Sequence, residues 1–187
     1  MKLGLAGDTM LGRKVAEAIS EQGPDAVLAD EVVAVAHEAD LLVLNLECCI
    51  SERGERRRDP GKPFFFRAPP AATEVLTRLG VDCVTPANNH VLDYGTEALL
   101  DTLTHLRAAG IAYVGAGPDV AAARAPADVA GGTAFESPFS TRVAGPILLA
   151  LRFDRAETLQ WTRVGASSRR FVRSGTGSIT GPEGGDS

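Results

Sequence analysis

The fold is decided by Leu41-Leu42-Val43-Leu44-Asn45-Leu46-Glu47, where an apolar run ends in an amide and a carboxylate. A short apolar run of this kind is typical of a buried strand in a parallel sheet. The same pattern occurs at Leu3-Gly4-Leu5-Ala6, which is followed by Gly7-Asp8, and at the apolar stretch that precedes Ala87-Asn88-Asn89-His90. Ligands of parallel α/β sheets collect at the carboxyl ends of the strands, so we expect these three polar loops to meet at one site.

Strands and helices are expected to alternate on both sides of this run. The predicted strands are 2–6, 41–44, 81–85 and 112–114, and the predicted helices are 13–22, 31–39, 71–79, a long one from Gly95 or Thr96 to Gly110, and 120–124. The charged segment 52–63 is predicted to be a surface loop, and the following Phe64-Phe65-Phe66 is expected to supply buried rings. This alternation predicts an α/β fold with a largely parallel N-terminal sheet.

The composition changes after residue 136. Residues 1–136 carry a net charge of −8, whereas 137–187 carry +3. Within the second part, 146–153 and 158–164 are expected to form a strand hairpin with its turn at 154–157. Ser, Gly and Arg dominate from Ser167 onward, which is typical of disorder. We therefore divide the chain into 1–136, a strand hairpin in 137–166 and a disordered tail in 167–187.

Length and charge exclude several classes of protein. The 187 residues, 44% of them hydrophobic, fit one domain with a real core. A net charge of −5 argues against nucleic-acid binding, which needs clustered Lys and Arg. The short basic run Arg56-Arg57-Arg58 is interpreted as a solvated loop face, with contact to an anionic substrate as the alternative. No stretch reaches the ~20 apolar residues of a membrane span, and no signal peptide is evident, so we expect a cytoplasmic protein.

The three cysteines do not form a disulfide framework, because their number is odd and two are adjacent. Cys83 lies in an apolar run and is expected to be a buried, inert thiol. Cys48 and Cys49 stand beside Glu47, where thiolates would suit zinc, but the neighbouring candidate ligands are mostly oxygen donors.

The candidate site brings two carboxylates together if the loops of Asp8 and Glu47 meet. Two ionised carboxylates at ~4 Å repel by about 4 kcal/mol at an effective dielectric of ~20, so a shared proton or a cation is needed. A divalent metal meets this need, and Asp, Glu, Asn and His suit Mg²⁺, Mn²⁺, Fe or Zn²⁺. Two such ions clamp a phosphoryl group and lower the pKa of bound water from ~15.7 toward ~7. Each residue taken singly has a structural interpretation as well, as a turn, a cap or a satisfied core histidine.

The order of the motifs is more specific than any one of them. It runs from Gly7-Asp8-Thr9-Met10-Leu11-Gly12-Arg13 through Asn45-Leu46-Glu47, Phe66-Arg67-Ala68-Pro69-Pro70 and 87–95 to Gly115-Ala116-Gly117. This succession resembles the CapA/PgsA family of bacterial capsule and poly-gamma-glutamate synthesis proteins, in the calcineurin-like metallophosphoesterase superfamily. The likeness covers roughly residues 1–128. It implies a metallophosphoesterase-like layered αββα sandwich, incomplete in this chain, and a metal-dependent phosphoesterase-type protein that acts in capsule or exopolymer synthesis.

The resemblance also implies roles for individual residues. The metal ligands are Asp8, Glu47 and Asn89, the catalytic residue is His90, and the substrate-binding residues are Asn45, Arg67 and Asn88. Met10 stands where the superfamily has a histidine, and Asn88 replaces the glycine of its Gly-Asn-His motif. Asp93 is expected to fix its loop or cap the next helix. Arg67 either binds an anionic substrate or ties down its own loop.

The chain also departs from the family pattern. Two later histidine motifs that complete the metal shell are absent, and the only other histidines, His37 and His105, fall in predicted helices. An internal deletion near 128–139, or a shifted reading frame or gene end, would each account for this. We therefore expect a shortened protein whose site, mononuclear or binuclear, is incomplete.

Three functions remain open. The first is a phosphoesterase-type enzyme that takes a phosphorylated or polyanionic small molecule and works with exopolymer-synthesis partners. The second is a catalytically degenerate or truncated binding module on the same scaffold. A nucleotide-binding Rossmann-type domain is the weakest of the three, because no Gly-x-Gly-x-x-Gly turn precedes a helix.

Overall fold

The computed structural model describes residues 2–129, 132–136, 149–153, 160–161, 172–173 and 178–180. The helices are α1 (Lys14–Gln22), the 3-10 helix η1 (Pro24–Val27), α2 (Asp30–Ala36), α3 (Ala72–Arg78), α4 (Gly95–Ala108) and α5 (Val120–Arg124). The strands are β1 (Lys2–Thr9), β2 (Leu41–Leu46), β3 (Cys49–Ile50), β4 (Arg67–Ala68), β5 (Cys83–Thr85), β6 (Ala112–Tyr113), β7 (Ala127–Val129), β8 (Gly132–Glu136), β9 (Leu149–Phe153), β10 (Gln160–Trp161), β11 (Val172–Arg173) and β12 (Ser178–Thr180).

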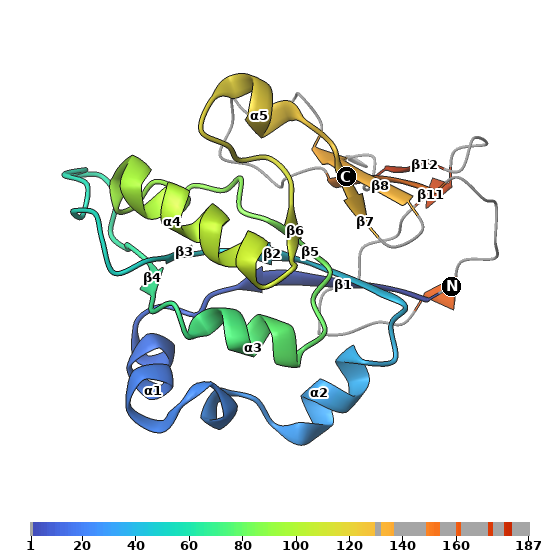
Figure 1. Cartoon of the computed structure of the whole chain (residues 1–187), viewed down its shortest axis with the longest axis horizontal. Coiled ribbons are helices and arrows are strands. Elements are labelled where there is room, and N and C mark those ends of the chain that lie inside the picture. The colour runs from blue at the N-terminus through green and yellow to red at the C-terminus, as the bar shows by residue number, and fades with distance from the viewer. Residues whose placement is uncertain are drawn as a thin grey trace, which may run out of the picture.

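A parallel sheet carries the candidate site. Its strand order is β10-β1-β2-β5-β6, and every neighbouring pair is parallel. Strand β2 is central and almost wholly buried, which explains its continuous apolar sequence. The strands run from the N-terminus, at the right of Figure 1, toward the end where β3 and β4 form a small sheet of their own. The predicted α/β architecture with a largely parallel sheet is confirmed.

The two faces of this sheet bury different partners. On one face, Leu42, Leu44 and Leu46 belong to a core cluster with Ile19 of α1 and with the buried side of α3. On the other face, the core cluster of Leu3, Leu41, Val43, Cys83 and Val114 packs against Ala127 and Val129 of β7. Successive side chains of a strand point to opposite faces, so the alternation along β2 supplies both cores at once.

Strand β7 begins a second, antiparallel sheet of order β11-β12-β9-β8-β7. Figure 1 shows this sheet on one side of β1 and β2, with α1, α2 and α3 on the other. Helices, parallel sheet and antiparallel sheet thus form successive layers, which are three of the four layers of the expected αββα sandwich.

Two strands are longer than the sequence predicts, and this corrects the setting of two candidate site residues. Strand β1 continues through Gly7 and Asp8 to Thr9, and β2 continues through Asn45 to Leu46. The register between them shifts between Ala6 and Asp8, after which Asp8 pairs with Asn45. This bulge keeps the ladder intact across a glycine, so Asp8 and Asn45 lie on strands and not on loops.

The predicted hairpin is wrong, since its two strands belong to different sheets. β9 pairs with β8 and β12, whereas β10 pairs in parallel with β1. The expected turn at 154–157 lies outside the described residues. Within the tail expected to be disordered, Val172–Arg173 and Ser178–Thr180 form strands β11 and β12, and the rest of that tail lies outside the described residues.

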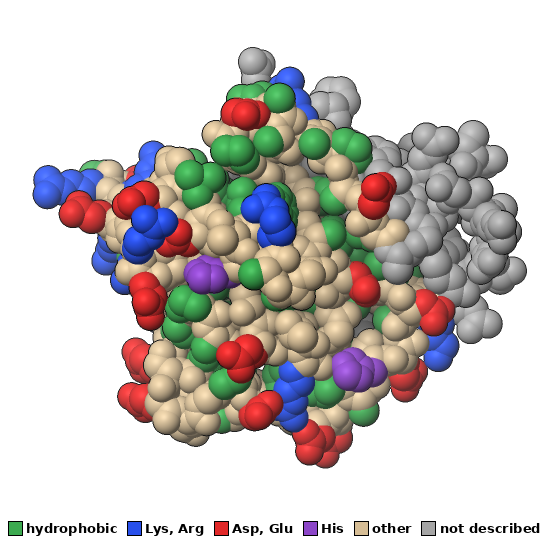
Figure 2. Space-filling view, viewed as in Figure 1, with side chains coloured by type: hydrophobic (Ala, Val, Ile, Leu, Met, Phe, Trp, Pro, Cys, Tyr) green, Lys and Arg blue, Asp and Glu red, His purple; other side chains and the backbone are tan. Residues whose placement is uncertain are grey.

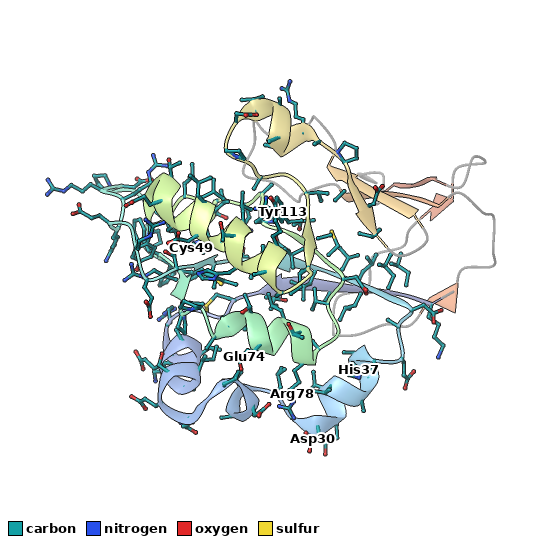
Figure 3. The ribbon with its side chains drawn as sticks, viewed as in Figure 1. Asp30, His37, Cys49, Glu74, Arg78 and Tyr113 are labelled. Carbon is teal, nitrogen blue, oxygen red and sulfur yellow. The ribbon has the colours of Figure 1, made fainter. Side chains whose placement is uncertain are left out.

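Polar contacts tie α2 to the end of α3. The Arg78 guanidinium pairs with Asp30 and donates to the carbonyl oxygen of Asp25, while a ring nitrogen of His37 lies 2.8 Å from the Arg78 carbonyl oxygen (Figure 3). Helix α3 ends as predicted at Gly80, whose φ of +69° suits glycine. His37 is therefore a structural residue on the helical side of the sheet.

Among the described residues, none of the helices combines the length and apolar character that crossing a bilayer requires.

The loop between β3 and β4 folds back onto the segment before α4. Gly54 has φ +83°, and a Cβ atom there would lie 2.1 Å from the Tyr94 carbonyl oxygen. Gly110 also has a positive φ, of +74°, but a Cβ atom at that position would meet nothing within 4 Å. Gly54 therefore combines a positive φ with close packing, whereas Gly110 has the positive φ alone.

Replacing Gly54 by Ala should destabilise the protein more than replacing Gly110 by Ala. Gly110→Ala should cost about 1–2 kcal/mol of unfolding free energy from its backbone conformation alone. Gly54→Ala should cost about 1–3 kcal/mol more, because the loop must also move away from Tyr94. Urea unfolding of both variants measures the difference, and equal losses would contradict the packing of this loop.

The three thiols are buried, as expected for Cys83. Burial is the largest cause that raises the pKa of Cys48, Cys49 and Cys83 from 9.0 to about 12. A thiol with a folded pKa above its unfolded value stabilises the fold fully below pH 9, and this contribution is lost as the pH rises toward 12. We expect the thiolate ultraviolet absorbance to appear near pH 9 in unfolded protein and well above it in native protein. Coincident titrations would show that the thiols are accessible.

Candidate functional site

The carboxyl ends of β1, β2 and β5 bring the predicted polar residues together. The Asn45 amide donates to the Asp8 carboxylate at 2.7 Å, across the pair that follows the bulge. In the register of β2 with β5, Asn45 lies opposite Thr85, whose hydroxyl is 3.4 Å from the Asn45 amide oxygen. The expectation that these strand ends converge is therefore met for Asp8 and Asn45.

Asn88 links the third loop to this edge. Its amide nitrogen donates to the Asn45 amide oxygen at 3.1 Å and to the Leu46 carbonyl at 2.7 Å. Its own amide oxygen accepts from the backbone N–H of His90 at 2.9 Å. Asn88 thus uses both ends of its amide to fix the loop to β2, which gives this predicted substrate-binding residue a structural role.

His90 is held by Asp93 and by an aromatic ring. Its Nδ1 atom lies 2.7 Å from a carboxylate oxygen of Asp93, and the same oxygen accepts from the Phe66 N–H at 2.7 Å. The Phe66 ring stacks on the imidazole with centroids 4.0 Å apart. Both His90 and Asp93 are buried. Asp93 fixes the loop, as one of its two expected roles required, and it orients the imidazole through Nδ1.

Lys62 closes the arrangement from the β3–β4 loop. Its ammonium group contacts the second carboxylate oxygen of Asp93 and the carbonyl oxygen of Asn89. The backbone N–H of Arg57 donates to the Asp93 carbonyl at 2.9 Å. The loop of 51–66 is therefore attached to the His90 loop at several points, and all of them involve Asp93 or its neighbours.

Glu47 interacts electrostatically with Asp8, His90 and Lys62. Its pKa is raised, first by burial and then by the Asp8 carboxylate, while the charges of His90 and Lys62 act in the opposite direction. Within the described part of the chain, its carboxylate has no hydrogen-bond partner. Glu47 and Asp8 therefore repel each other, as the sequence predicts for two carboxylates at one site.

The remaining predicted residues, Asn89 and Arg67, differ in whether other residues already bond their side chains. Asn89 is exposed, and no described residue bonds its side-chain amide. The Arg67 guanidinium donates to the carbonyls of Arg53 and Gly54 and lies 4.2 Å from the centre of the Tyr94 ring. Arg67 is expected either to bind an anionic substrate or to tie down its own loop. These contacts correspond to the loop role.

The donor types at this edge of the sheet are those that a hard divalent cation prefers, and not those of zinc. Among the described residues, no three His, Cys, Asp or Glu side chains lie close enough to form a metal cluster. Cys48 and Cys49 are buried with raised pKa values of about 12, so they stay protonated and are poor ligands at neutral pH. Asp8 and Glu47, with the Asn89 amide, suit an ion such as Mg²⁺ that is held by one or two carboxylates and keeps several waters.

Sequence patterns do not predict the contacts of two residues of this site, Lys62 and Phe66. Lys62 sits in a charged surface loop, 31 positions before Asp93, and no local pattern marks its contact. Phe66 belongs to the triplet expected to be buried, but it is the only one of the three that is, and Phe64 is 52% exposed. In an extended segment neighbouring rings face opposite sides, so Phe66 turns toward His90 while its neighbour Phe65 turns away.

Removing the charge of Asp93 should cost far more than removing that of an exposed aspartate. Asp93→Asn leaves the Lys62 ammonium buried without its partner, and breaking a buried pair costs about 3–5 kcal/mol. The control is Asp30→Asn, because Asp30 is 92% exposed where it pairs with Arg78 and such pairs contribute about 0–1 kcal/mol. Urea unfolding compares the two variants, and similar losses would show that Asp93 does not organise the site.

Comparison with known proteins gives the family. The family model described as "Bacterial capsule synthesis protein PGA_cap" matches residues 2–134. A "Probable polyglutamine synthesis accessory protein" of Mycobacterium tuberculosis is 42% identical over 85 residues, which is 46% of this chain and 22% of that protein. The "Capsule biosynthesis protein CapA" of Bacillus anthracis is 28% identical over 118 residues, 63% of this chain and 28% of that protein.

The "PGA biosynthesis protein CapA" of Bacillus subtilis is 25% identical over 117 residues, 63% of this chain and 30% of that protein. The chain thus spans less than a third of the length of these curated relatives. The match to the family model covers most of this chain, including all the candidate site residues, and that family has the metallophosphoesterase-like fold expected from the sequence. The chain belongs to the family of bacterial capsule synthesis proteins represented by the PGA_cap model.

Proposed function

We propose that this chain takes part in capsule or poly-gamma-glutamate synthesis through a divalent-metal-dependent phosphoesterase-type site. Family membership supports the first half of the proposal. The second half rests mainly on one observation. The buried His90–Asp93 pair stands beside two carboxylates, Asp8 and Glu47, whose mutual repulsion a bound cation would relieve.

Asp8, Glu47 and Asn89 would hold the cation. Glu47 is partly desolvated and repelled by Asp8, so a positive ion between them relieves both effects. Asn89 presents its exposed amide from the neighbouring loop. A bound divalent ion supplies charge neutralisation for a phosphoryl group and an acidified water.

His90 would move the proton in the reaction. With Nδ1–H donating to Asp93, Nε2 is the free nitrogen, and in the imidazolium form its N–H would give a proton to the departing oxygen of a phosphoester. The stack on Phe66 and the backbone contact to Asn88 keep the ring from rotating away. The Asp93 carboxylate at Nδ1 also fixes the orientation of the ring, so that Nε2 is the nitrogen available to the substrate.

The substrate would be a phosphorylated or polyanionic small molecule. The M. tuberculosis relative is named as an accessory protein of polyglutamine synthesis, and an accessory role for this chain implies contacts with proteins that make the polymer. We expect these partners, and not a nucleic acid, because the chain is acidic overall.

A binding or structural module on the same scaffold is the second candidate. It is favoured by the lack of a cluster of three metal-ligating His, Cys, Asp or Glu side chains in the described ranges. In that case the loop network around Asp93 would serve only to shape a surface for a partner.

Mn²⁺ titration distinguishes the two candidates. We expect isothermal titration to give a saturable Mn²⁺ site in the metal-stripped chain, and affinity to fall about tenfold or more in Asp8→Ala, since a carboxylate ligand is lost. Asp40→Ala removes a carboxylate at the opposite end of the same strands and is the matched control. Hydrolysis of an aryl phosphate is then measured with Mn²⁺ in wild type and in His90→Gln.

The outcomes separate the proposals. Mn²⁺ binding with hydrolysis that His90→Gln abolishes supports the phosphoesterase. A stably folded chain that neither binds Mn²⁺ nor hydrolyses the ester refutes it and favours the module. Equal Mn²⁺ affinity in wild type and Asp8→Ala would place any metal elsewhere.

A further inference from the structure

Arg13 has an unusual backbone conformation next to the candidate site. Among the described residues it is the only non-glycine residue with positive φ, at φ 55° and ψ −129°, and it directly precedes α1. Steric contact with Cβ disfavours this conformation in L-residues and costs about 1–3 kcal/mol. The neighbouring Gly12 packs closely against β4, because a Cβ there would lie 3.1 Å from the Arg67 backbone nitrogen. A glycine at position 13 would avoid this backbone strain. The presence of arginine there therefore indicates a role for its side chain.

The Arg13 guanidinium stands at the outer end of a stack that leads to His90. Its Cζ lies 5.2 Å from the centre of the Phe64 ring. Phe64 stacks on Phe66 with centroids 6.3 Å apart and planes 16° apart, and Phe66 stacks on His90 at 4.0 Å. The stack therefore connects an exposed cation with the buried imidazole at the centre of the site.

The charge of Arg13 has no carboxylate partner in the described part of the chain. Arg53 pairs with Asp101 and Arg78 pairs with Asp30, whereas the described contact of the Arg13 side chain is with the Phe64 ring. A cation over a ring at an exposed position gains only about 0.5–1 kcal/mol. A guanidinium binds an oxyanion more strongly, through two parallel hydrogen bonds. Exchange of the ring for an anion is therefore favourable.

Two other cations near the site, Lys62 and Arg67, are less available. The Lys62 ammonium is used by Asp93, and the Arg67 guanidinium is used by carbonyls and by Tyr94. Figure 2 shows Lys and Arg side chains at the end of the molecule that carries the β3–β4 loop, with Asp and Glu side chains beside them. Arg13 differs from these loop cations because it extends the chain segment that contains Asp8, so it is tied to the site through the backbone.

We propose that Arg13 is an anion-binding residue of the candidate site, whose guanidinium leaves the Phe64 ring to bind a phosphate or carboxylate oxyanion of the substrate. The inference rests on the proposed function for the location of the site, while oxyanion binding by Arg13 needs no metal. The strained backbone is then the cost of presenting a guanidinium at a position that would otherwise be glycine.

Titration of the full chain with inorganic phosphate and, separately, with glutarate tests the proposal in the presence of a chelator. We expect wild type to bind at least one of the two anions, and Arg13→Gly to bind it about tenfold more weakly. Lys14→Gln removes the neighbouring positive charge and should change the affinity by less than about twofold, because an exposed charge acts weakly at a distance. Binding of phosphate alone identifies a phosphoester as the source of the anion, and binding of glutarate alone identifies a carboxylate.

Arg13→Gly also tests the strain. It should raise the urea midpoint of unfolding, since glycine adopts φ 55° freely, so a loss of anion binding in this variant cannot be ascribed to unfolding. The proposal is overturned if wild type binds neither anion, if Arg13→Gly binds as well as wild type, or if Lys14→Gln loses as much as Arg13→Gly. Anion binding through Arg13 without any Mn²⁺ binding would refute the proposed metal-dependent function and leave this inference standing.

Discussion

The arrangement of the site depends on the buried carboxylate of Asp93. One oxygen meets His90 Nδ1 and the Phe66 N–H, the other meets the Lys62 ammonium, and the backbone carbonyl receives the Arg57 N–H. A desolvated carboxylate is costly unless each of its oxygens is satisfied, so these contacts are needed together. The β3–β4 loop, the edge strand β4 and the loop of His90 are consequently held in one arrangement by a single side chain.

The other half of the site is held by the sheet itself. Asp8 and Asn45 face each other across the last rungs of β1 and β2, and Asn88 joins them through a side-chain hydrogen bond and a backbone contact. This edge is rigid because β2 is buried on both faces. The site therefore combines acidic groups on a fixed edge with cationic groups on a loop that depends on Asp93. A change in the loop would alter the charge balance at Glu47 without moving the carboxylates.

Local sequence patterns predict the strands, helices and strand-end residues, because burial and periodicity are encoded within a few positions. They do not predict contacts between distant segments. The extension of β1 past Gly7 needs the partner Asn45, the pairing of β10 with β1 joins opposite ends of the chain, and Lys62 reaches Asp93 across a loop. Sequence favours a hairpin in the second part because neighbouring strands usually pair. Hydrophobicity alone likewise cannot tell that Phe66 is buried while Phe64 is exposed.

The groups around Glu47 act on its carboxylate in opposite directions. Burial and then Asp8 raise the pKa of Glu47, whereas His90 and Lys62 lower it, and because the pKa is raised overall these two groups do not fully compensate. Lys62 thus reduces the repulsion that Asp8 exerts on Glu47, and the repulsion that remains is the reason why the proposed site would favour a bound cation.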